Sequence, residues 1–261
     1  MSVKRPLIFV HGNWGDEFSW QMLASKFKAA GYPVLCLSMP GRGDDSVGKY
    51  SINDFSEVIS AAVTAQEKEF GTRPIVFGHS LGATTALKAA EKIEIGGLVL
   101  VAPSSPVNMP QPSLSWPMLR LFLPWILQTL WRRTSRFAYK PPLWAVGGLF
   151  RGWPKEAIEQ AHQLMHKDSS RTTYEFARRL AAAQVDPLKI KCPILCVAGT
   201  LDEVCPPKIV EKLSQWLSDA RFEKIEGSHF LIMEREAVDM IFSLVSQWLE
   251  NQGACSTRAS A

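Results

Sequence analysis

The 261-residue sequence lacks the features of membrane-spanning, fibrous and disordered proteins. It has no internal repeat and no low-complexity tract, and its longest apolar stretch, 114–131, contains an arginine and two prolines. We therefore expect no transmembrane helix. Hydrophobic residues make up 46% of the chain and charged residues 21%, which is typical of a globular protein.

A strong charge of either sign is also missing. The formal net charge is only +4, and basic residues alternate with aromatic ones in a single segment, within 95–155. Nucleic-acid-binding proteins usually carry a far more basic patch or stripe. We therefore expect no nucleic acid partner.

Cysteines are few and odd in number, five in all. Cys36, Cys192 and Cys196 lie in or beside short apolar runs, where a thiol behaves as a small buried hydrophobe. The spacing of Cys192 and Cys196 fits neither a redox motif nor a zinc site. The apolar run at 7–10 is much shorter than the core of a signal peptide. We expect a cytoplasmic protein with reduced thiols and no metal or other cofactor.

The sequence does contain a series of short apolar runs, most of them followed by a helical pattern. Each run is bounded by glycine or proline. This alternation predicts an α/β fold, with a mostly parallel central sheet flanked by helices. The predicted strands are 7–10, 34–37, 75–77, 98–101 and 194–198.

The alternation stops between residues 104 and 186, where prolines, tryptophans and arginines crowd together. We interpret 104–186 as an inserted helical cap. The predicted core then consists of residues 1–103 and 187–252. Residues 253–261 are small and polar, so we expect them to form a disordered tail.

Residues 78–82, Gly-His-Ser-Leu-Gly, follow a predicted strand and precede a helical pattern. This is the context of a nucleophile elbow, a sharp turn that presents a reactive side chain from a strained backbone. Side chains at positions 78 and 82 would collide with the neighbouring strand or helix, so both residues must be small. We predict that Ser80 is a nucleophile.

A serine hydroxyl needs a base near neutral pH, and two later residues supply the partners. Asp202 follows the predicted strand 194–198, at the sheet edge where open α/β sheets keep their sites. His229 follows one further helix and strand. We predict that His229 accepts the proton of Ser80 and that Asp202 holds the useful tautomer, with Glu203 as the alternative acid.

A glycine-rich turn at 11–15 follows the first predicted strand. Such a turn can aim a backbone N–H at the negative oxygen that develops during acyl transfer. We assign this donor to Asn13 and pair it with the amide of Leu81. The residues expected to line the substrate site are Trp14, His79, Trp116 and Phe230.

With these motifs the chain resembles the α/β-hydrolase superfamily, especially its serine esterase and lipase branch with a helical cap. The resemblance rests on the histidine-glycine turn at 11–12, the elbow at 78–82 and the late Asp202 and His229, and it covers nearly the whole chain, most weakly in the cap. Residues 39–44 are similar to the family's turn after the second strand. The resemblance implies the α/β-hydrolase fold.

Some relatives fit less well than others. Haloalkane dehalogenases and epoxide hydrolases have an aspartate at the elbow, where this chain has Ser80, and plant hydroxynitrile lyases have a lysine after the catalytic histidine, where this chain has Phe230. The resemblance therefore favours a serine hydrolase that cleaves carboxylic esters through an acyl-enzyme. Thioesterase, lactonase and cofactor-free haloperoxidase activities need the same residues, and a non-catalytic ligand-binding receptor on this scaffold is a further alternative.

The predicted cap is unusual in its charge. Between residues 95 and 155 there is no Asp or Glu, whereas seven Lys and Arg residues and five of the nine tryptophans lie there. Such a segment suits a lid over an apolar or lipid-like acyl group, and it predicts a weak contact with an anionic membrane surface. The alternative is that the cap's large apolar residues only pack on the core, namely Leu119, Leu121, Leu123, Ile126, Leu127 and Leu130. The expected partner is a small-molecule ester, and the sequence leaves the oligomeric state open.

Overall fold

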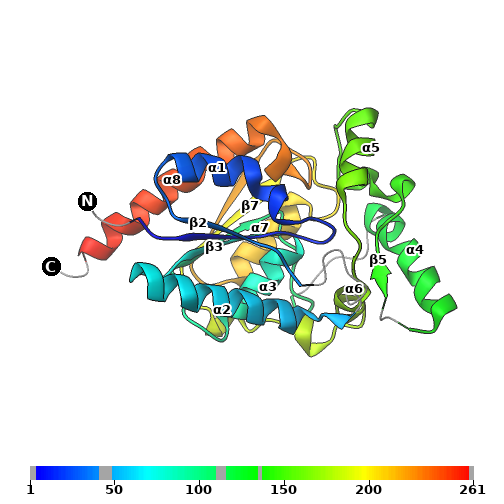
Figure 1. The fold of residues 1–261 in the computed structure, drawn as a ribbon, viewed down its shortest axis with the longest axis horizontal. Helices are drawn as coiled ribbons and strands as arrows, with labels where there is room; N and C mark the ends of the chain where they lie inside the picture. The colour runs from blue at the N-terminus through cyan, green and yellow to red at the C-terminus, as the bar shows by residue number, and fades with distance from the viewer. Residues whose placement is uncertain (1–3, 41–48, 110–115, 135–136, 259–261) are drawn as a thin grey trace.

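The computed structural model describes residues 4–40, 49–109, 116–134 and 137–258 (Figure 1). Its main sheet has six parallel strands in the order β2-β1-β3-β4-β7-β8, so the predicted parallel sheet is confirmed. The strands are β1 (Leu7–Val10), β2 (Val34–Leu37), β3 (Ile75–His79), β4 (Gly97–Val101), β7 (Ile194–Gly199) and β8 (Ala220–Ile225). Of the turn predicted at 39–44, residues 41–44 lie outside the described residues.

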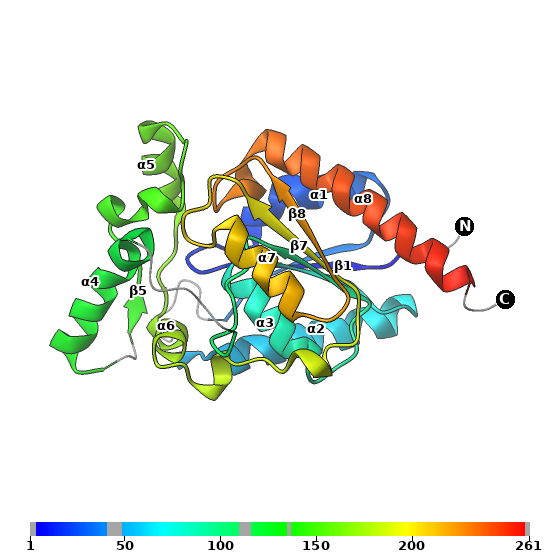
Figure 2. The same cartoon turned by 180° about the vertical axis from the view of Figure 1, so that it is seen from behind.

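Helices cover both faces of this sheet (Figures 1 and 2). One face carries α1 (Gln21–Ala29) and α8 (Arg235–Arg258), and the other carries α2 (Ile52–Phe70), α3 (Leu81–Ala90) and α7 (Pro207–Trp216). The first strand shows why its residues are apolar throughout. Leu7 and Phe9 are buried on the side of α1 and α8, and Ile8 and Val10 on the opposite side.

The ends of α2 have the structure that their residues predict. Ser51 and Asp54 form a capping box, in which each side chain accepts a hydrogen bond from the other residue's backbone N–H. Gly71 follows the helix in the left-handed region, with φ of 67°. The long helix therefore begins and ends at signals encoded in its own sequence.

An insertion between β4 and β7 lies beyond the carboxyl ends of the strands (Figure 1). It contains a two-stranded antiparallel sheet, β5 with β6, that the sequence pattern did not predict because each strand is only two residues long. The other elements are helical: α4 (Trp116–Arg132), η3 (Leu143–Gly148), α5 (Lys155–Leu164), α6 (Ser170–Ala177) and η4 (Ala181–Ala183), with β5 at Ala138–Tyr139 and β6 at Asp168–Ser169.

The C-terminal helix α8 extends to Arg258, into the segment 253–261 for which the sequence predicts a disordered tail. Residues 259–261 lie outside the described part of the chain.

No helix among the described residues is long and apolar enough to cross a membrane. Cys36, Cys192, Cys196 and Cys205 are free thiols.

Candidate active site

Ser80 lies on a sharp turn between β3 and α3. Its backbone has φ of 51° and ψ of −116°, a strained conformation that costs a non-glycine residue about 1–3 kcal/mol. Two backbone hydrogen bonds hold the turn: Ser80 N–H donates to the carbonyl of Val101 at 3.1 Å, and Ser104 N–H donates to the carbonyl of Ser80 at 3.1 Å. The surrounding structure thus imposes the strain.

The glycines on either side of the turn have no room for a side chain. A Cβ on Gly78 would lie 2.6 Å from the Cα of Ala83, and one on Gly82 would lie 2.5 Å from the carbonyl oxygen of Val10. Both distances are far below a normal contact. The predicted collision with the neighbouring strand and helix is therefore confirmed.

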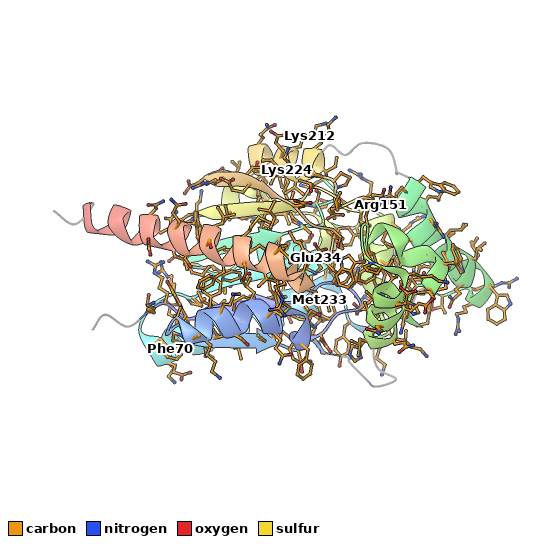
Figure 3. All side chains as sticks on the ribbon, turned by 90° about the horizontal axis from the view of Figure 1, so that it is seen from above. Phe70, Arg151, Lys212, Lys224, Met233 and Glu234 are labelled. Carbon is orange, nitrogen blue, oxygen red and sulfur yellow. The ribbon has the colours of Figure 1, made fainter. Side chains whose placement is uncertain are left out.

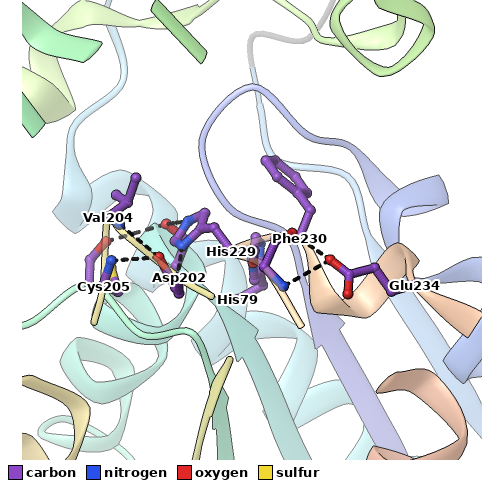
Figure 4. A network of polar contacts seen from close by, with 10 residues as sticks. His79, Asp202, Val204, Cys205, His229, Phe230 and Glu234 are labelled. Carbon is purple, nitrogen blue, oxygen red and sulfur yellow. Dashed lines mark hydrogen bonds and ion pairs between the residues drawn. The ribbon is translucent and has the colours of Figure 1, made fainter. Parts of the chain in front are cut away.

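Ser80, His229 and Asp202 form one hydrogen-bonded chain. The Nε2 of His229 lies 3.0 Å from the Oγ of Ser80. Its Nδ1 lies 2.7 Å from the Oδ2 of Asp202 (Figure 4). All three side chains are buried. They come from β3–α3, from the loop after β7 and from the loop after β8, so the fold assembles residues that lie up to 149 positions apart.

The carboxylate of Asp202 is fixed from behind. Its Oδ1 accepts hydrogen bonds from the backbone N–H groups of Val204 and Cys205, each at 2.8 Å (Figure 4). Its other oxygen is then free to face the imidazole. The alternative acid, Glu203, instead forms an ion pair with Arg151 at 3.6 Å. The geometry therefore favours Asp202 as the partner of His229.

The loop that carries His229 is held by a residue that the sequence analysis missed, Glu234. Its Oε1 accepts hydrogen bonds from the backbone N–H of Ser228 at 2.9 Å and from the hydroxyl of Ser228 at 2.5 Å. The same oxygen accepts a hydrogen bond from the indole N–H of Trp153 in the insertion. A glutamate five residues after a candidate histidine carries no motif, so only the structure reveals this role.

The ring of His79 holds the backbone of His229 through a hydrogen bond. Its Nε2 donates a hydrogen bond to the carbonyl of His229 at 2.8 Å, and its Nδ1 has no partner among the described residues. Burial, with the neighbouring His229, lowers the pKa of His79 to about 3. The ring is therefore neutral and carries its proton on Nε2. The sequence predicts that His79 lines the substrate site, but its ring is 1% exposed and packs among the rings of Trp20, His229 and Phe230.

The turn at 11–15 approaches the elbow closely. A Cβ on Gly12 would lie 2.9 Å from the Cβ of Ser80. Leu81 is the first residue of α3, so its N–H has no acceptor within the helix. The Oδ1 of Asn13 is buried and has no partner among the described residues. This geometry is compatible with the backbone amides of Asn13 and Leu81 as oxyanion donors, and their assignment stays a prediction.

Residues of the insertion form hydrogen bonds with this turn. Trp14, with φ of 60°, donates its backbone N–H to the carboxylate of buried Asp168, and its carbonyl accepts the N–H of His166 at 2.8 Å. The ring of His166 donates to Asp16 at 2.9 Å. No local pattern marks this role of Asp168, because its partner lies 154 positions away.

Of the remaining residues predicted to line the site, Trp14 and Phe230 are buried in one apolar cluster of core and insertion side chains. The ring of Phe230 stacks on Phe150, with centroids 4.9 Å apart. Trp116 lies elsewhere, at the start of α4, and is 72% exposed. The members of the apolar cluster are Trp14, Leu121, Trp125, Phe137, Tyr139, Val146, Leu149, Phe150, Ala161, Met165 and Phe230.

A cavity of about 550 Å³ lies where α8 meets the insertion. Arg151, Met233 and Glu234 lie on its wall (Figure 3). Ser80 does not line it, so this cavity is separate from the candidate nucleophile.

Asp202, Cys205 and His229 also place ligand atoms within 4.8 Å of one another, close enough for a metal ion. Burial and the nearby Asp202 raise the pKa of the Cys205 thiol well above its usual value, which disfavours the thiolate that a metal binds. The carboxylate and the imidazole already hydrogen bond to each other. The donor set thus fits a base held by its carboxylate partner better than a metal centre.

Comparison with known proteins supports the fold. The model of the alpha/beta hydrolase family matches residues 7–239. No curated protein matches the sequence significantly. A solved monoacylglycerol lipase from Paleococcus ferrophilus is 22% identical, with a TM-score of 0.71 and coverage of 95% of this chain and 96% of that chain.

Two esterases of known structure are similar to a like degree. The thermophilic esterase of Thermogutta terrifontis is 17% identical, with a TM-score of 0.71 and coverage of 97% of this chain and 92% of that chain. The esterase of Exiguobacterium antarcticum is 20% identical, with a TM-score of 0.70 and coverage of 96% and 93%. At such low identity these likenesses show the fold alone.

Proposed function

The chain belongs to the alpha/beta hydrolase family, and from this premise we propose that it is a serine hydrolase that cleaves carboxylic esters of apolar or lipid-like acyl groups. The observation that carries the proposal is the continuous hydrogen-bonded chain from Ser80 through His229 to Asp202. A protein that only binds a ligand has no need of a base aligned on a strained, buried serine.

In the proposed reaction the Oγ of Ser80 attacks the ester carbonyl while the Nε2 of His229 accepts the hydroxyl proton. Asp202 stabilises the imidazolium that forms. The backbone amides of Asn13 and Leu81 would stabilise the oxyanion. His229 then protonates the leaving alcohol, and water activated by the same base hydrolyses the acyl-enzyme and frees Ser80.

The preference for an apolar acyl group rests on the apolar cluster. Phe230 follows His229 directly, and its ring lies 5.8 Å from the imidazole. Phe150 and Trp125 extend this apolar surface into the insertion, which we interpret as a cap. An acyl chain bound next to the cluster would leave water for an apolar environment.

The test is a panel of p-nitrophenyl esters, acyl thioesters and lactones, together with labelling by a fluorophosphonate probe. We expect labelling that Ser80→Ala abolishes and a kcat/KM that is highest for esters. A higher kcat/KM for thioesters or lactones would replace the ester assignment, and an unlabelled wild-type protein would favour a ligand-binding receptor.

We also propose a reducing, cytoplasmic location, which the free thiols support.

A further inference from the structure

The solvent-facing side of α4 is apolar. Seven large apolar side chains are spaced one, three or four residues apart, at positions that share one side of the helix. Trp131 is 80% exposed and Leu130 69% exposed. We call this surface the α4 face: Trp116, Leu119, Leu123, Ile126, Leu127, Leu130 and Trp131.

The core is not what these residues pack against. Only Leu121 and Trp125 of α4 are buried. Of the six cap residues that packing alone would place inside, five are therefore on the surface. A soluble monomer seldom gathers so many exposed apolar side chains in one patch, and such patches usually mark an interaction site.

Three arginines lie on or beside the α4 face. Arg120 lies on it, with its guanidinium 5.9 Å from the ring of Trp144, which is itself half exposed. Arg132, at the end of the helix, lies 5.8 Å from the ring of Trp131 and 5.2 Å from the ring of Phe137, and Arg133 next to it is exposed. The sequence from 95 to 155 holds no carboxylate side chain that could neutralise them.

We propose that the α4 face docks on the surface of an anionic lipid bilayer, with the helix lying in the plane of the interface. Leucines enter the acyl boundary in such an arrangement, tryptophans lie at the level of the headgroups, and arginines pair with lipid phosphates. Because the opposite side of α4 supplies Leu121 and Trp125 to the apolar cluster, docking brings the insertion and the candidate site to the membrane together.

A second copy of the chain is a poorer occupant. A twofold contact through α4 would bring its cations close to their own copies, since each partner presents the same patch. Residues 95–155 offer no carboxylate to compensate this repulsion. An anionic bilayer supplies both the apolar phase and the opposite charge.

The test is co-sedimentation with vesicles, which needs no turnover. We expect the wild-type protein to bind vesicles of equal parts phosphatidylcholine and phosphatidylglycerol at least tenfold more tightly than vesicles of phosphatidylcholine alone, and to lose this difference at high salt. Arg132→Gln and Arg133→Gln should each weaken anionic binding about fivefold. Leu130→Ser should weaken binding to both vesicles roughly tenfold.

Matched variants control for exposure and charge. Leu188 on η5 (Pro187–Lys189) is 72% exposed, so Leu188→Ser is the control for Leu130→Ser. Lys208→Gln with Lys212→Gln removes two exposed cations from α7 and is the control for the arginines. Both should bind like the wild type, and so should Ser80→Ala, which separates docking from the proposed hydrolysis.

Any of three results overturns the proposal. The first is the absence of sedimentation with anionic vesicles at low salt, and the second is sedimentation that Leu130→Ser leaves unchanged. The third is a wild-type dimer, measured by light scattering, that Leu130→Ser converts to a monomer, since a second copy would then occupy the α4 face.

Discussion

The indole N–H of Trp153 donates a hydrogen bond to the Oε1 of Glu234 at 2.8 Å. The same oxygen accepts the two hydrogen bonds of Ser228, the residue before His229. One carboxylate oxygen therefore joins the insertion to the loop that presents the candidate base.

Removing this carboxylate should misplace His229 without touching the substrate. We expect Glu234→Ala to lower kcat about 10- to 100-fold, because a shift of about 1 Å in a catalytic group costs this much, while KM changes little. Trp153→Phe, which removes only the contact from the insertion, should cost less than tenfold. If both variants instead lose kcat to the same extent and also lose stability to the same extent, the role of Glu234 is purely structural.

Ser80 is the residue on which the proposed chemistry depends. We expect Ser80→Ala to lower kcat/KM about 10³- to 10⁶-fold at an unchanged melting temperature, since only the oxyanion donors and substrate binding would remain. Steady-state hydrolysis of a p-nitrophenyl ester measures the loss, and circular dichroism checks the fold. Near-wild-type turnover by this variant would refute the acyl-enzyme mechanism.

The elbow glycines should be sensitive to a single methyl group. Gly82→Ala places a Cβ 2.5 Å from the backbone oxygens of Val10 and His11, so β1 or α3 must move, and we expect a loss of about 3 kcal/mol or more in the free energy of unfolding. Gly147→Ala is the matched control, because its Cβ would meet nothing within 4 Å and should change stability by less than about 0.5 kcal/mol. Urea denaturation measures both.

The sequence predicted the sheet well for a physical reason. Strands buried on both faces must be apolar throughout, so the runs at 7–10 and 98–101 fall within β1 and β4. The elbow was equally readable, because a turn that tight permits only glycine at Gly78 and Gly82. Family membership and the α/β-hydrolase fold are accordingly confirmed.

Other features depend on contacts between distant residues, which no local pattern encodes. Asp168 and Glu234 matter through partners in other elements. The periodicity of α4 predicts a helix but not which of two apolar sides faces the core, so packing and docking could not be separated. The sequence places His79 at the substrate site because it lies in the elbow, and Trp116 because it belongs to the predicted cap, but the surroundings of both depend on the tertiary fold.

Buried His79 should make the protein sensitive to acid. Its pKa is about 3 when folded and near 6.5 when unfolded, so between these values only the unfolded chain takes up the proton. The contribution of neutral His79 to the free energy of unfolding is therefore fully present above pH 6.5. It falls as the pH drops, by roughly 2–3 kcal/mol at pH 4.5. We expect His79→Gln, which keeps a donor for the carbonyl of His229, to lose less stability between pH 7.5 and pH 4.5 in urea titrations. Parallel losses in both proteins would contradict this assignment.

The length of the acyl chain tests whether the apolar cluster serves the substrate. Each methylene transferred from water to an apolar environment contributes about 0.8 kcal/mol, or roughly fourfold in kcat/KM, until the pocket is full. We expect kcat/KM for p-nitrophenyl esters to rise from acetate through butyrate to hexanoate, measured without vesicles and with the esters dissolved as monomers.

The matching variants lie on opposite sides of the same insertion. Phe150→Ala opens the apolar cluster where Phe150 stacks on Phe230, and should flatten the rise with chain length. Leu130→Ser changes only the α4 face and should leave the rise intact, because its side chain is exposed on the side of α4 away from the cluster. If acetate is the best substrate of the wild-type protein, or if Leu130→Ser flattens the rise as much as Phe150→Ala does, the cluster is packing and the acyl chain binds elsewhere.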